Sequence, residues 1–288
     1  MPMKEQGSIA QAYGRLAKCA LCPRACLVDR DNGEIGYCGA GKDLMIAEIG
    51  PHFGEETPLV GRNGSGAVFM SGCPLKCEFC QNHATSNGAG EKTSVSEMVN
   101  SMMRLQQIGC HNINFVTPTH YTPHIMEAIS LARTRGLRIP IVYNCGGYES
   151  VETLKMLEGY INIYMPDIKF LDAALAQRYC NVPDYPQVVK AAIKEMHRQV
   201  GDLEIDDSDM AVRGLLVRHL VMPGATDDSK AVIDFIDEEI SPDTYLNVME
   251  QYRPSFRAYK YPEINRPLTE REFKTVFDYA ASKGLRLA

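Results

Sequence analysis

The chain has 288 residues, of which 45% are hydrophobic and 23% are charged, and its formal net charge is −6. This length allows one large domain or two small ones with a buried core. The acidic balance does not indicate a nucleic-acid partner, and no apolar run reaches the roughly 18 residues that a membrane helix needs. The polar start of the chain lacks the apolar stretch of a signal peptide, so we expect a cytoplasmic protein with no membrane partner.

Residues 1–60 are rich in glycine and cysteine and show no long periodic segment. Four of their cysteines have knuckle-like spacing: Cys19, Cys22, Cys26 and Cys38. Because thiols stay reduced in the cytoplasm, such a group favours metal binding over disulfides. Four thiolates suit either tetrahedral zinc or a fully ligated iron–sulfur cluster. We therefore predict a cysteine-rich metal-binding extension and leave the metal open between these two.

Residues 61–288 alternate short apolar runs with amphipathic stretches, which predicts a second unit built on a parallel sheet. The expected strands are 67–71, 113–116, 139–143, 161–165, 215–221 and 245–249. The expected helices are 94–108, 123–135, 151–158, 173–179, 187–200, 229–239 and one starting near 269. Capping boxes are expected at Ser94 with Glu97 and at Thr269 with Glu272. The acidic segment 200–210 is expected to be a surface loop, and the pattern as a whole predicts a partial (β/α)6 TIM-like barrel.

Three cysteines follow the first expected strand with the spacing C-x3-C-x2-C: Cys73, Cys77 and Cys80. Thiolates are the usual ligands of iron–sulfur clusters. Three thiolates on a four-iron cube leave one iron without a protein ligand, and an open coordination position marks a catalytic metal site. The alternatives are a zinc knuckle completed by His83, or three cysteines buried in the core.

Polar residues stand at the ends of the later strands, where a parallel β/α barrel carries its active site. They include Thr117, Thr119, Asn144, Asp167, Lys169, Arg218 and Gln251. Asp167 and Lys169 share one strand face, so a structural ion pair is the alternative reading. His120 and His219 stay open between structural and active-site roles. The isolated Cys110, Cys145 and Cys180 are expected to be small buried hydrophobes, with Cys145 also lying at a strand end.

The C-x3-C-x2-C motif with the aromatic Phe79 before its last cysteine resembles the radical S-adenosylmethionine (SAM) superfamily. In that family the amino and carboxylate groups of SAM bind the open iron of a [4Fe–4S] cluster. An electron from the reduced cluster then splits SAM into methionine and a 5′-deoxyadenosyl radical, which takes a hydrogen atom from the substrate. The resemblance implies that Cys73, Cys77 and Cys80 hold the catalytic cluster and that Phe79 lies against the adenine.

Over most of residues 60–260 the chain resembles the pyruvate formate-lyase activating enzyme-like branch, in a sub-branch with an extra N-terminal cysteine motif. The match includes Gln81-Asn82, the Asp167-x-Lys169 motif, and Arg218 ahead of Pro223-Gly224. In related enzymes the lysine and arginine help to hold the SAM carboxylate and ribose. This chain departs from the branch where many members carry Gly-Gly-Glu for the SAM amino group, because it has Thr117-Pro118-Thr119 instead.

The resemblance implies SAM cleavage, a flavodoxin- or ferredoxin-like reductant, and a glycyl radical enzyme as the first candidate partner. The residues expected to bind SAM are Phe79, Thr117, Thr119, Asn144, Asp167, Lys169, Arg218 and Gln251. One alternative is a radical SAM enzyme that acts on a small molecule or peptide. Another is a non-enzymatic iron–sulfur electron-transfer or cluster-carrier protein. The polar strand ends argue against the carrier, because a carrier needs no SAM pocket.

Overall fold

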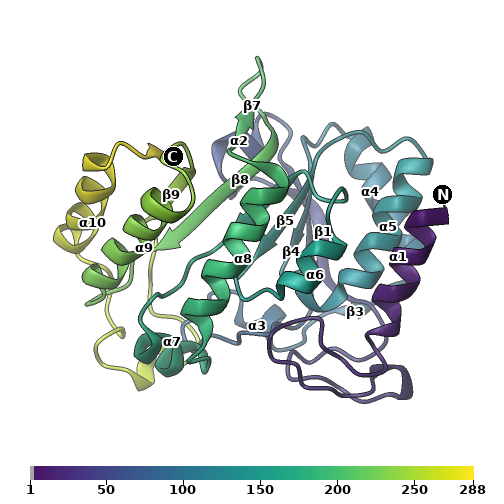
Figure 1. Ribbon diagram of the computed structural model, residues 1–288, viewed down its shortest axis with the longest axis horizontal. Coiled ribbons are helices and arrows are strands. Elements are labelled where there is room, and N and C mark those ends of the chain that lie inside the picture. Colours follow the sequence, from purple (N-terminus) through teal and green to yellow (C-terminus); the bar gives the residue numbers. More distant parts are fainter. Residues whose placement is uncertain (1–2) are drawn as a thin grey trace.

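A mostly parallel sheet forms the centre of the molecule, as seen in a computed structural model that describes residues 3–288 (Figure 1). Its strands follow the order β10-β9-β8-β6-β5-β4-β2-β1-β3. Neighbours from β2 to β10 are parallel, β1 is antiparallel to β2 and β3, and β7 is antiparallel to β8. The strands are β1 Met45–His52, β2 Ser65–Met70, β3 Glu91–Lys92, β4 Ile113–Val116, β5 Ile141–Cys145, β6 Ile163–Pro166, β7 Glu204–Ile205, β8 Ala211–Leu220, β9 Tyr245–Met249 and β10 Arg286–Leu287.

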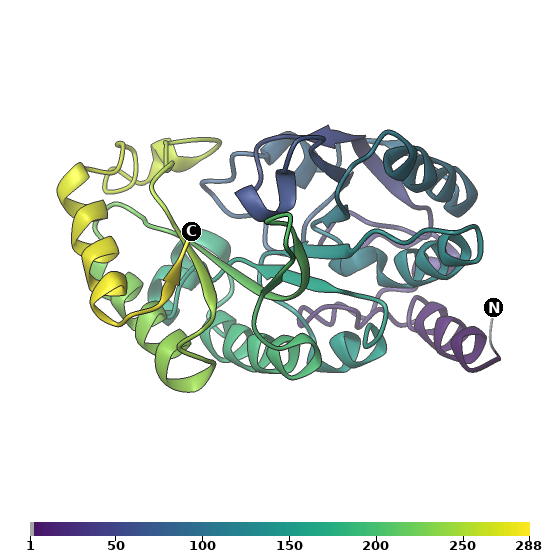
Figure 2. The ribbon, with the colours of Figure 1, turned by 90° about the horizontal axis from the view of Figure 1, so that it is seen from above.

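Helices cover the outside of this curved sheet as an arc, which Figure 2 shows from above. The helices are α1 Met3–Gly14, α2 Thr57–Val60, α3 His83–Ser86, α4 Val95–Gln107, α5 Thr122–Thr134, α6 Val151–Met156, α7 Ala173–Cys180, α8 Tyr185–Val200, α9 Thr226–Glu239 and α10 Glu270–Ser282. The short α2 and α3 lie outside this arc. Within the described residues, the end strands β3 and β10 do not pair with each other, so the sheet stays open. The prediction of a partial (β/α)6 barrel is confirmed.

All six strands expected from the sequence are present, because each is a short apolar run between helices. The runs 113–116 and 245–249 match β4 and β9 residue for residue. The other strands begin or end a few residues away from the expected positions. The segment 200–210 is not only a loop, because it contains β7, which pairs with β8.

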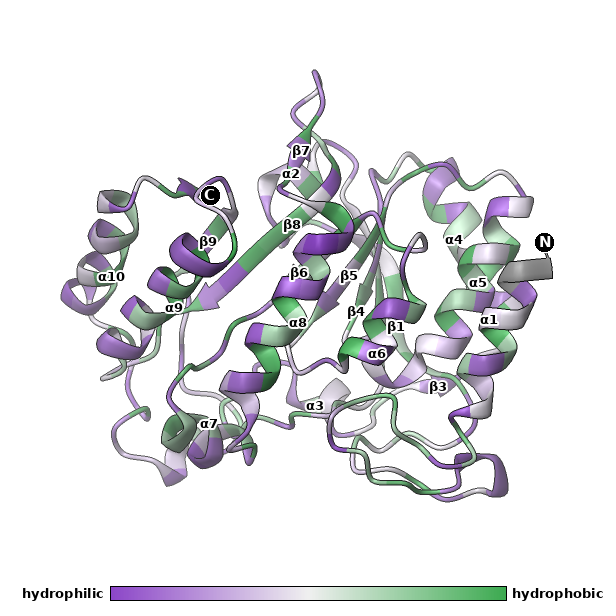
Figure 3. Cartoon of the chain, in the orientation of Figure 1, coloured by the Kyte–Doolittle hydropathy of each residue, from purple (hydrophilic) through white to green (hydrophobic). Residues whose placement is uncertain are grey.

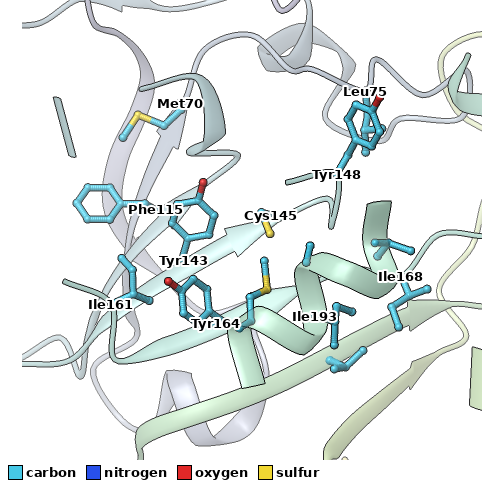
Figure 4. Packing of buried hydrophobic residues seen from close by; sticks show 14 of the residues in the cluster. Met70, Leu75, Phe115, Tyr143, Cys145, Tyr148, Ile161, Tyr164, Ile168 and Ile193 are labelled. Atoms are coloured by element: carbon cyan, nitrogen blue, oxygen red, sulfur yellow. The ribbon is translucent and has the colours of Figure 1, made fainter. Parts of the chain in front are cut away.

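The interior is packed with side chains from neighbouring strands, and apolar residues concentrate there in Figure 3. Phe115, Tyr143 and Tyr164 lie opposite one another on β4, β5 and β6, and all three are fully buried. Figure 4 shows this packing, in which the Tyr143 and Tyr164 rings meet edge to face at 5.8 Å. Burial on both faces explains why these strands read as continuous apolar runs rather than as alternating ones.

Part of the predicted extension joins the barrel. Strand β1 lies within residues 1–60 and pairs with β2. The sequence analysis also found no long periodic segment there, whereas the structure has helix α1. Its sequence is only weakly amphipathic, and contacts with α5 hold it: Ala12 is fully buried, and the Tyr13 hydroxyl donates a hydrogen bond to Glu127. The domain division at residue 60 remains a prediction.

Both predicted capping boxes are present, and the one at Ser94 offers a stability test. The Ser94 side chain accepts a hydrogen bond from the Glu97 amide, and the Glu97 carboxylate accepts one from the Ser94 amide. We expect Ser94→Ala to lower the free energy of unfolding by about 1 kcal/mol, because one end of α4 loses its cap. Denaturant unfolding followed by circular dichroism measures this loss. Ser101→Ala, inside the same helix, is the control and should not destabilise the protein; equal losses in both variants would contradict the capping argument.

Candidate active site

A cavity of about 390 Å³ lies at the carboxyl edge of the parallel strands. Its volume falls in the range of small-molecule sites. The residues predicted from the sequence to form the cluster and SAM sites all line it: Cys73, Cys77, Phe79, Cys80, Thr117, Thr119, Asn144, Asp167, Lys169, Arg218 and Gln251. The structure thus brings together side chains that are up to 178 positions apart in the sequence (73 to 251). Their individual roles remain predictions.

The cysteine loop leaves β2 through a turn that only glycine fits well. Gly72 has φ +89°, and a Cβ there would lie 2.5 Å from the backbone oxygen of Cys38. The Cys73 amide donates a hydrogen bond to the same oxygen at 3.0 Å. The extension therefore lies directly against the start of the cysteine loop.

The thiols of this loop are suited to a metal centre. Burial, together with the neighbouring Cys77, raises the pKa of Cys73 to about 12, and burial also raises the pKa of Cys80. A buried thiolate needs a compensating positive charge, and iron would supply it. The Leu75 amide already donates a hydrogen bond to the Cys73 sulfur at 3.4 Å. The donor set and its surroundings fit the [4Fe–4S] cluster that the sequence motif implies.

Cys180 lies against this group and is more than a small buried hydrophobe. It ends α7, is 2% exposed, and its thiol donates a hydrogen bond to the Cys77 sulfur at 3.2 Å. Cys145 is also buried and lines the cavity, whereas the buried Cys110 does not. The spacing in the sequence carries no signal for the contact of Cys77 with Cys180, because β3, β4, β5 and β6 separate the loop from α7 along the chain.

A network of buried charges lies beside the cysteines and is centred on Arg218 of β8. The Arg218 guanidinium donates to Asp167 Oδ1 at 2.7 Å, Asn144 Oδ1 at 2.8 Å and Glu55 Oε2 at 3.0 Å. Lys169 Nζ lies 2.9 Å from Asp167 Oδ2. Burial alone would raise the pKa of Asp167, but the charges of Arg218 and Lys169 outweigh it and lower this pKa to about 2. The Asp167–Lys169 ion pair exists, and both residues also line the cavity.

Two cavity carboxylates were missed by the sequence analysis. Glu55 follows β1, a strand that the sequence analysis did not identify, and its carboxylate pairs with Arg218. Glu149 lies four residues after the end of β5, and it accepts hydrogen bonds from the Thr119 hydroxyl at 2.7 Å and the Tyr143 hydroxyl at 3.1 Å. Glu149 forms no ion pair with any residue from 3 to 288, and burial raises its pKa to about 7. The one sequence signal was its place just beyond a strand end.

Neither His120 nor His219 lines the cavity. Both ring nitrogens of His219 are engaged, by the Ile168 carbonyl and the Ser229 hydroxyl, so His219 is structural. His120 Nε2 contacts the Ser71 carbonyl oxygen at 2.8 Å, and His120 does not line the cavity. His83 stacks on Phe256 with its ring 5.2 Å away and lies outside the cavity lining, so it does not complete a zinc knuckle there.

The N-terminal cysteines lie outside the cavity. Cys19, Cys22 and Cys38 are buried and Cys26 is exposed. In the part of the chain that the structure describes, no three His, Cys, Asp or Glu side chains are placed to enclose a single metal ion. The second metal site therefore remains a prediction at this point. The described helices include none that is long and apolar enough to cross a membrane.

Comparisons with known proteins place the chain in a family. Residues 67–236 match the family model described as the radical SAM superfamily. An uncharacterised protein of Methanocaldococcus jannaschii is 31% identical over 278 residues, covering 93% of this chain and 76% of that protein.

Solved structures are more distant. Streptococcus suis SuiB is 15% identical with a TM-score of 0.49, covering 75% of this chain and 46% of SuiB. The protein anSMEcpe, solved with bound AdoMet, is 12% identical with a TM-score of 0.49, covering 75% of this chain and 61% of that one. The chain thus spans about half the length of SuiB. The family match covers more than half of the present sequence and includes the cysteine loop, and on these grounds the chain belongs to the radical SAM superfamily of enzymes.

Proposed function

We propose that the chain cleaves SAM reductively at a [4Fe–4S] cluster held by Cys73, Cys77 and Cys80. The observation that carries the proposal is that these thiols line the same cavity as two cations and three carboxylates. The cations are Lys169 and Arg218, which pair with Asp167 and Glu55, and the third carboxylate is Glu149. When bound, the cluster and SAM supply the electron transfer and the radical that takes a hydrogen atom from the substrate. The chain's own residues bind and orient these groups and keep water away.

Lys169 is suited to hold a ligand carboxylate. Its Nζ forms one hydrogen bond among residues 3–288, to Asp167, which leaves two of its three donors free for a ligand. Arg218 is held more firmly, because Nε bonds Asp167, Nη1 bonds Glu55 and Nη2 bonds Asn144, which leaves two of its five N–H donors. We therefore assign Lys169 to the SAM carboxylate and Arg218 to positioning Asp167 and Asn144.

Glu149 is suited to receive the SAM amino group in place of the missing Gly-Gly-Glu. The Thr119 hydroxyl donates its one proton to Glu149, so it orients that carboxylate and can itself only accept a further hydrogen bond. Thr117 is held at φ +56°, an unusual conformation for a β-branched residue, with its amide bonded to the Asn144 carbonyl. Glu149 is the cavity carboxylate without a cationic partner among the described residues, and an ammonium group would supply one.

For the substrate, we propose a backbone glycine of a partner protein. The open sheet, whose end strands do not pair within the described residues, supports access by a polypeptide loop. The resemblance to the activating-enzyme branch supports the same class. A one-electron reductant of the flavodoxin or ferredoxin class would reduce the cluster.

The role of Lys169 is tested by Lys169→Gln. We expect SAM binding to weaken roughly ten- to hundredfold, because one charge-assisted hydrogen bond is lost. Iron content should not change. Lys190→Gln is the matched control, since Lys190 pairs with Glu239 on the outer helices. Equilibrium binding on the cluster-loaded protein measures the SAM affinity of both variants. Equal affinities would show that Lys169 forms only a structural ion pair.

The role of Glu149 is tested through pH. Its pKa of about 7 means that Glu149 is protonated in much of the unliganded protein near neutral pH. A cationic ligand binds the ionised form, so SAM affinity should fall as pH decreases from about 8 to about 5.5. Asp167, His120 and His219 have lowered pKa values of about 2, 4 and 4, which lie below this range.

The matched variant is Glu149→Gln, which should bind SAM more weakly at about pH 8 and lose this part of the pH dependence. Glu270→Gln, at an exposed position of α10, controls for the loss of one carboxylate. A Glu149→Gln variant that keeps the wild-type pH profile would show that Glu149 does not receive the cation.

SAM cleavage itself is measured by 5′-deoxyadenosine after anaerobic reconstitution and reduction. The wild-type protein should form it, and Cys73→Ala should not. Cys110→Ala removes a buried cysteine that does not line the cavity and should retain activity. Product from Cys73→Ala, or none from a fully loaded wild type, contradicts the proposal.

The substrate class is read out by adding candidate glycyl radical enzymes to the reduced protein with SAM. A persistent carbon-centred radical on the partner, seen by electron paramagnetic resonance, supports a glycine substrate. Turnover of a small molecule or peptide with no radical on any partner would replace this substrate while leaving SAM cleavage intact.

A further inference from the structure

Arg30 is a buried cation without a carboxylate partner. Its side chain is completely buried, and among the described residues it forms no ion pair with an aspartate or glutamate. Its Nε donates to the Gly41 carbonyl at 2.8 Å, and its Nη1 donates to the His120 carbonyl at 2.7 Å. Its Nη2 finds no hydrogen-bond partner among residues 3–288. A guanidinium stays charged in proteins, and a buried charge needs compensation.

Thiols of the N-terminal segment lie near this cation, along with the Tyr121 ring at 5.8 Å. The Cys19 sulfur lies 3.8 Å from Arg30 Nη1. The sulfurs of Cys26 and Cys38 flank Gly36, each 3.4 Å from the position that a Cβ would take there. A Cβ at position 36 would touch both sulfurs at van der Waals distance, so the two thiols lie beside the same point of the backbone.

Two of these cysteine sulfurs accept hydrogen bonds from backbone amides of the following turn. The amides of Arg24 and Ala40 donate hydrogen bonds to the sulfurs of Cys22 and Cys38, each from two residues further along the chain. The Leu75 amide makes the same bond to Cys73 in the cluster loop. Amide bonds to sulfur stabilise thiolates and tune metal centres.

Backbone strain is concentrated in the same segment. Ala25 has φ +40° and Leu27 has φ +57°, although neither is glycine. The Leu27 amide donates to the Cys19 carbonyl and the Ala25 amide to the Cys22 carbonyl. Both hydrogen bonds are 3.0 Å long and hold the two residues in this conformation. Residues keep such conformations when the surrounding structure fixes them, commonly at functional sites.

From these observations we propose that Cys19, Cys22, Cys26 and Cys38 bind a second metal centre through four thiolates, with Arg30 as its buried counter-cation. Four thiolates on Zn²⁺ carry a net charge of about −2, and so do four thiolates on an oxidised [4Fe–4S] cluster. Either centre would supply the negative charge that Arg30 lacks. The proposal does not rest on SAM cleavage and extends beyond the proposed function.

The second centre would be coupled to the cysteine loop. The Cys38 carbonyl accepts the Cys73 amide, and Arg30 holds the His120 carbonyl while His120 contacts the Ser71 carbonyl. Figure 1 shows the N-terminal loops at the lower side of the molecule, toward which the arrowhead of β8 points. Losing the metal would therefore free the backbone that positions Cys73.

The test is metal and sulfide analysis of the full-length chain carrying Cys73→Ala, Cys77→Ala and Cys80→Ala together, which removes the first cluster. We expect each chain to retain about one zinc, or about four irons with sulfide. Adding Cys22→Ser and Cys38→Ser should remove that metal, whereas adding Cys110→Ser should not. Retained zinc would support a tetrathiolate zinc site, and retained iron with sulfide would support a tetrathiolate iron–sulfur cluster.

A second measurement covers the case in which the multiple variants do not fold. Wild-type protein, purified anaerobically, is titrated for reactive thiols with and without a strong chelator. Exposed Cys26 should react only after the chelator removes the metal. Arg30→Met should lose metal to the chelator at least severalfold faster than wild type, because the counter-cation is gone. The proposal would be overturned if the wild type held no metal beyond the first cluster and Cys26 reacted before the chelator was added.

Discussion

The ion pair between Asp167 and Arg218 sets the geometry of the site. It joins the ends of β6 and β8 just beyond their paired residues. Beside it, the Ile168 amide donates a hydrogen bond to the Arg218 carbonyl. A buried ion pair adds little net stability, but losing one partner leaves an uncompensated charge that costs about 3–5 kcal/mol. The pair therefore acts chiefly as a constraint: it fixes Lys169, Asn144 and Glu55 around the cavity.

That constraint also decides the charge of the cavity. Among the residues that line the cavity, the cations Arg218 and Lys169 pair with the carboxylates Asp167 and Glu55, and Glu149 has no cation. Outside the lining, the buried Glu56 carboxylate also lies 3.9 Å from Arg218. SAM carries a sulfonium, an ammonium and a carboxylate, so it is a cation overall near neutral pH. A pocket with one surplus carboxylate and one lysine with free donors complements both ends of such a ligand.

The sequence was sufficient to predict those parts of the fold and site that depend on local pattern. Short apolar runs predicted the parallel strands. Because the carboxyl ends of parallel strands meet at one edge, the polar residues that follow them, from Thr117 after β4 to Gln251 after β9, could be assigned to one cavity. Glu55 was not predictable, because it enters from an antiparallel strand added at the edge of the sheet. The contact of Cys180 with Cys77 and the burial of Arg30 depend on how distant segments pack, and spacing carries no signal for that.

Long-range packing also ties the N-terminal segment to the cluster loop. The Arg24 guanidinium donates to the carbonyls of Pro74, Cys180 and Asn181, and so joins the extension, the loop and the end of α7. The most direct test of the account is electron paramagnetic resonance of the reduced, cluster-loaded protein before and after SAM is added. The account predicts a [4Fe–4S] signal whose g values change when SAM binds the open iron. A cluster signal left unchanged by saturating SAM would contradict it.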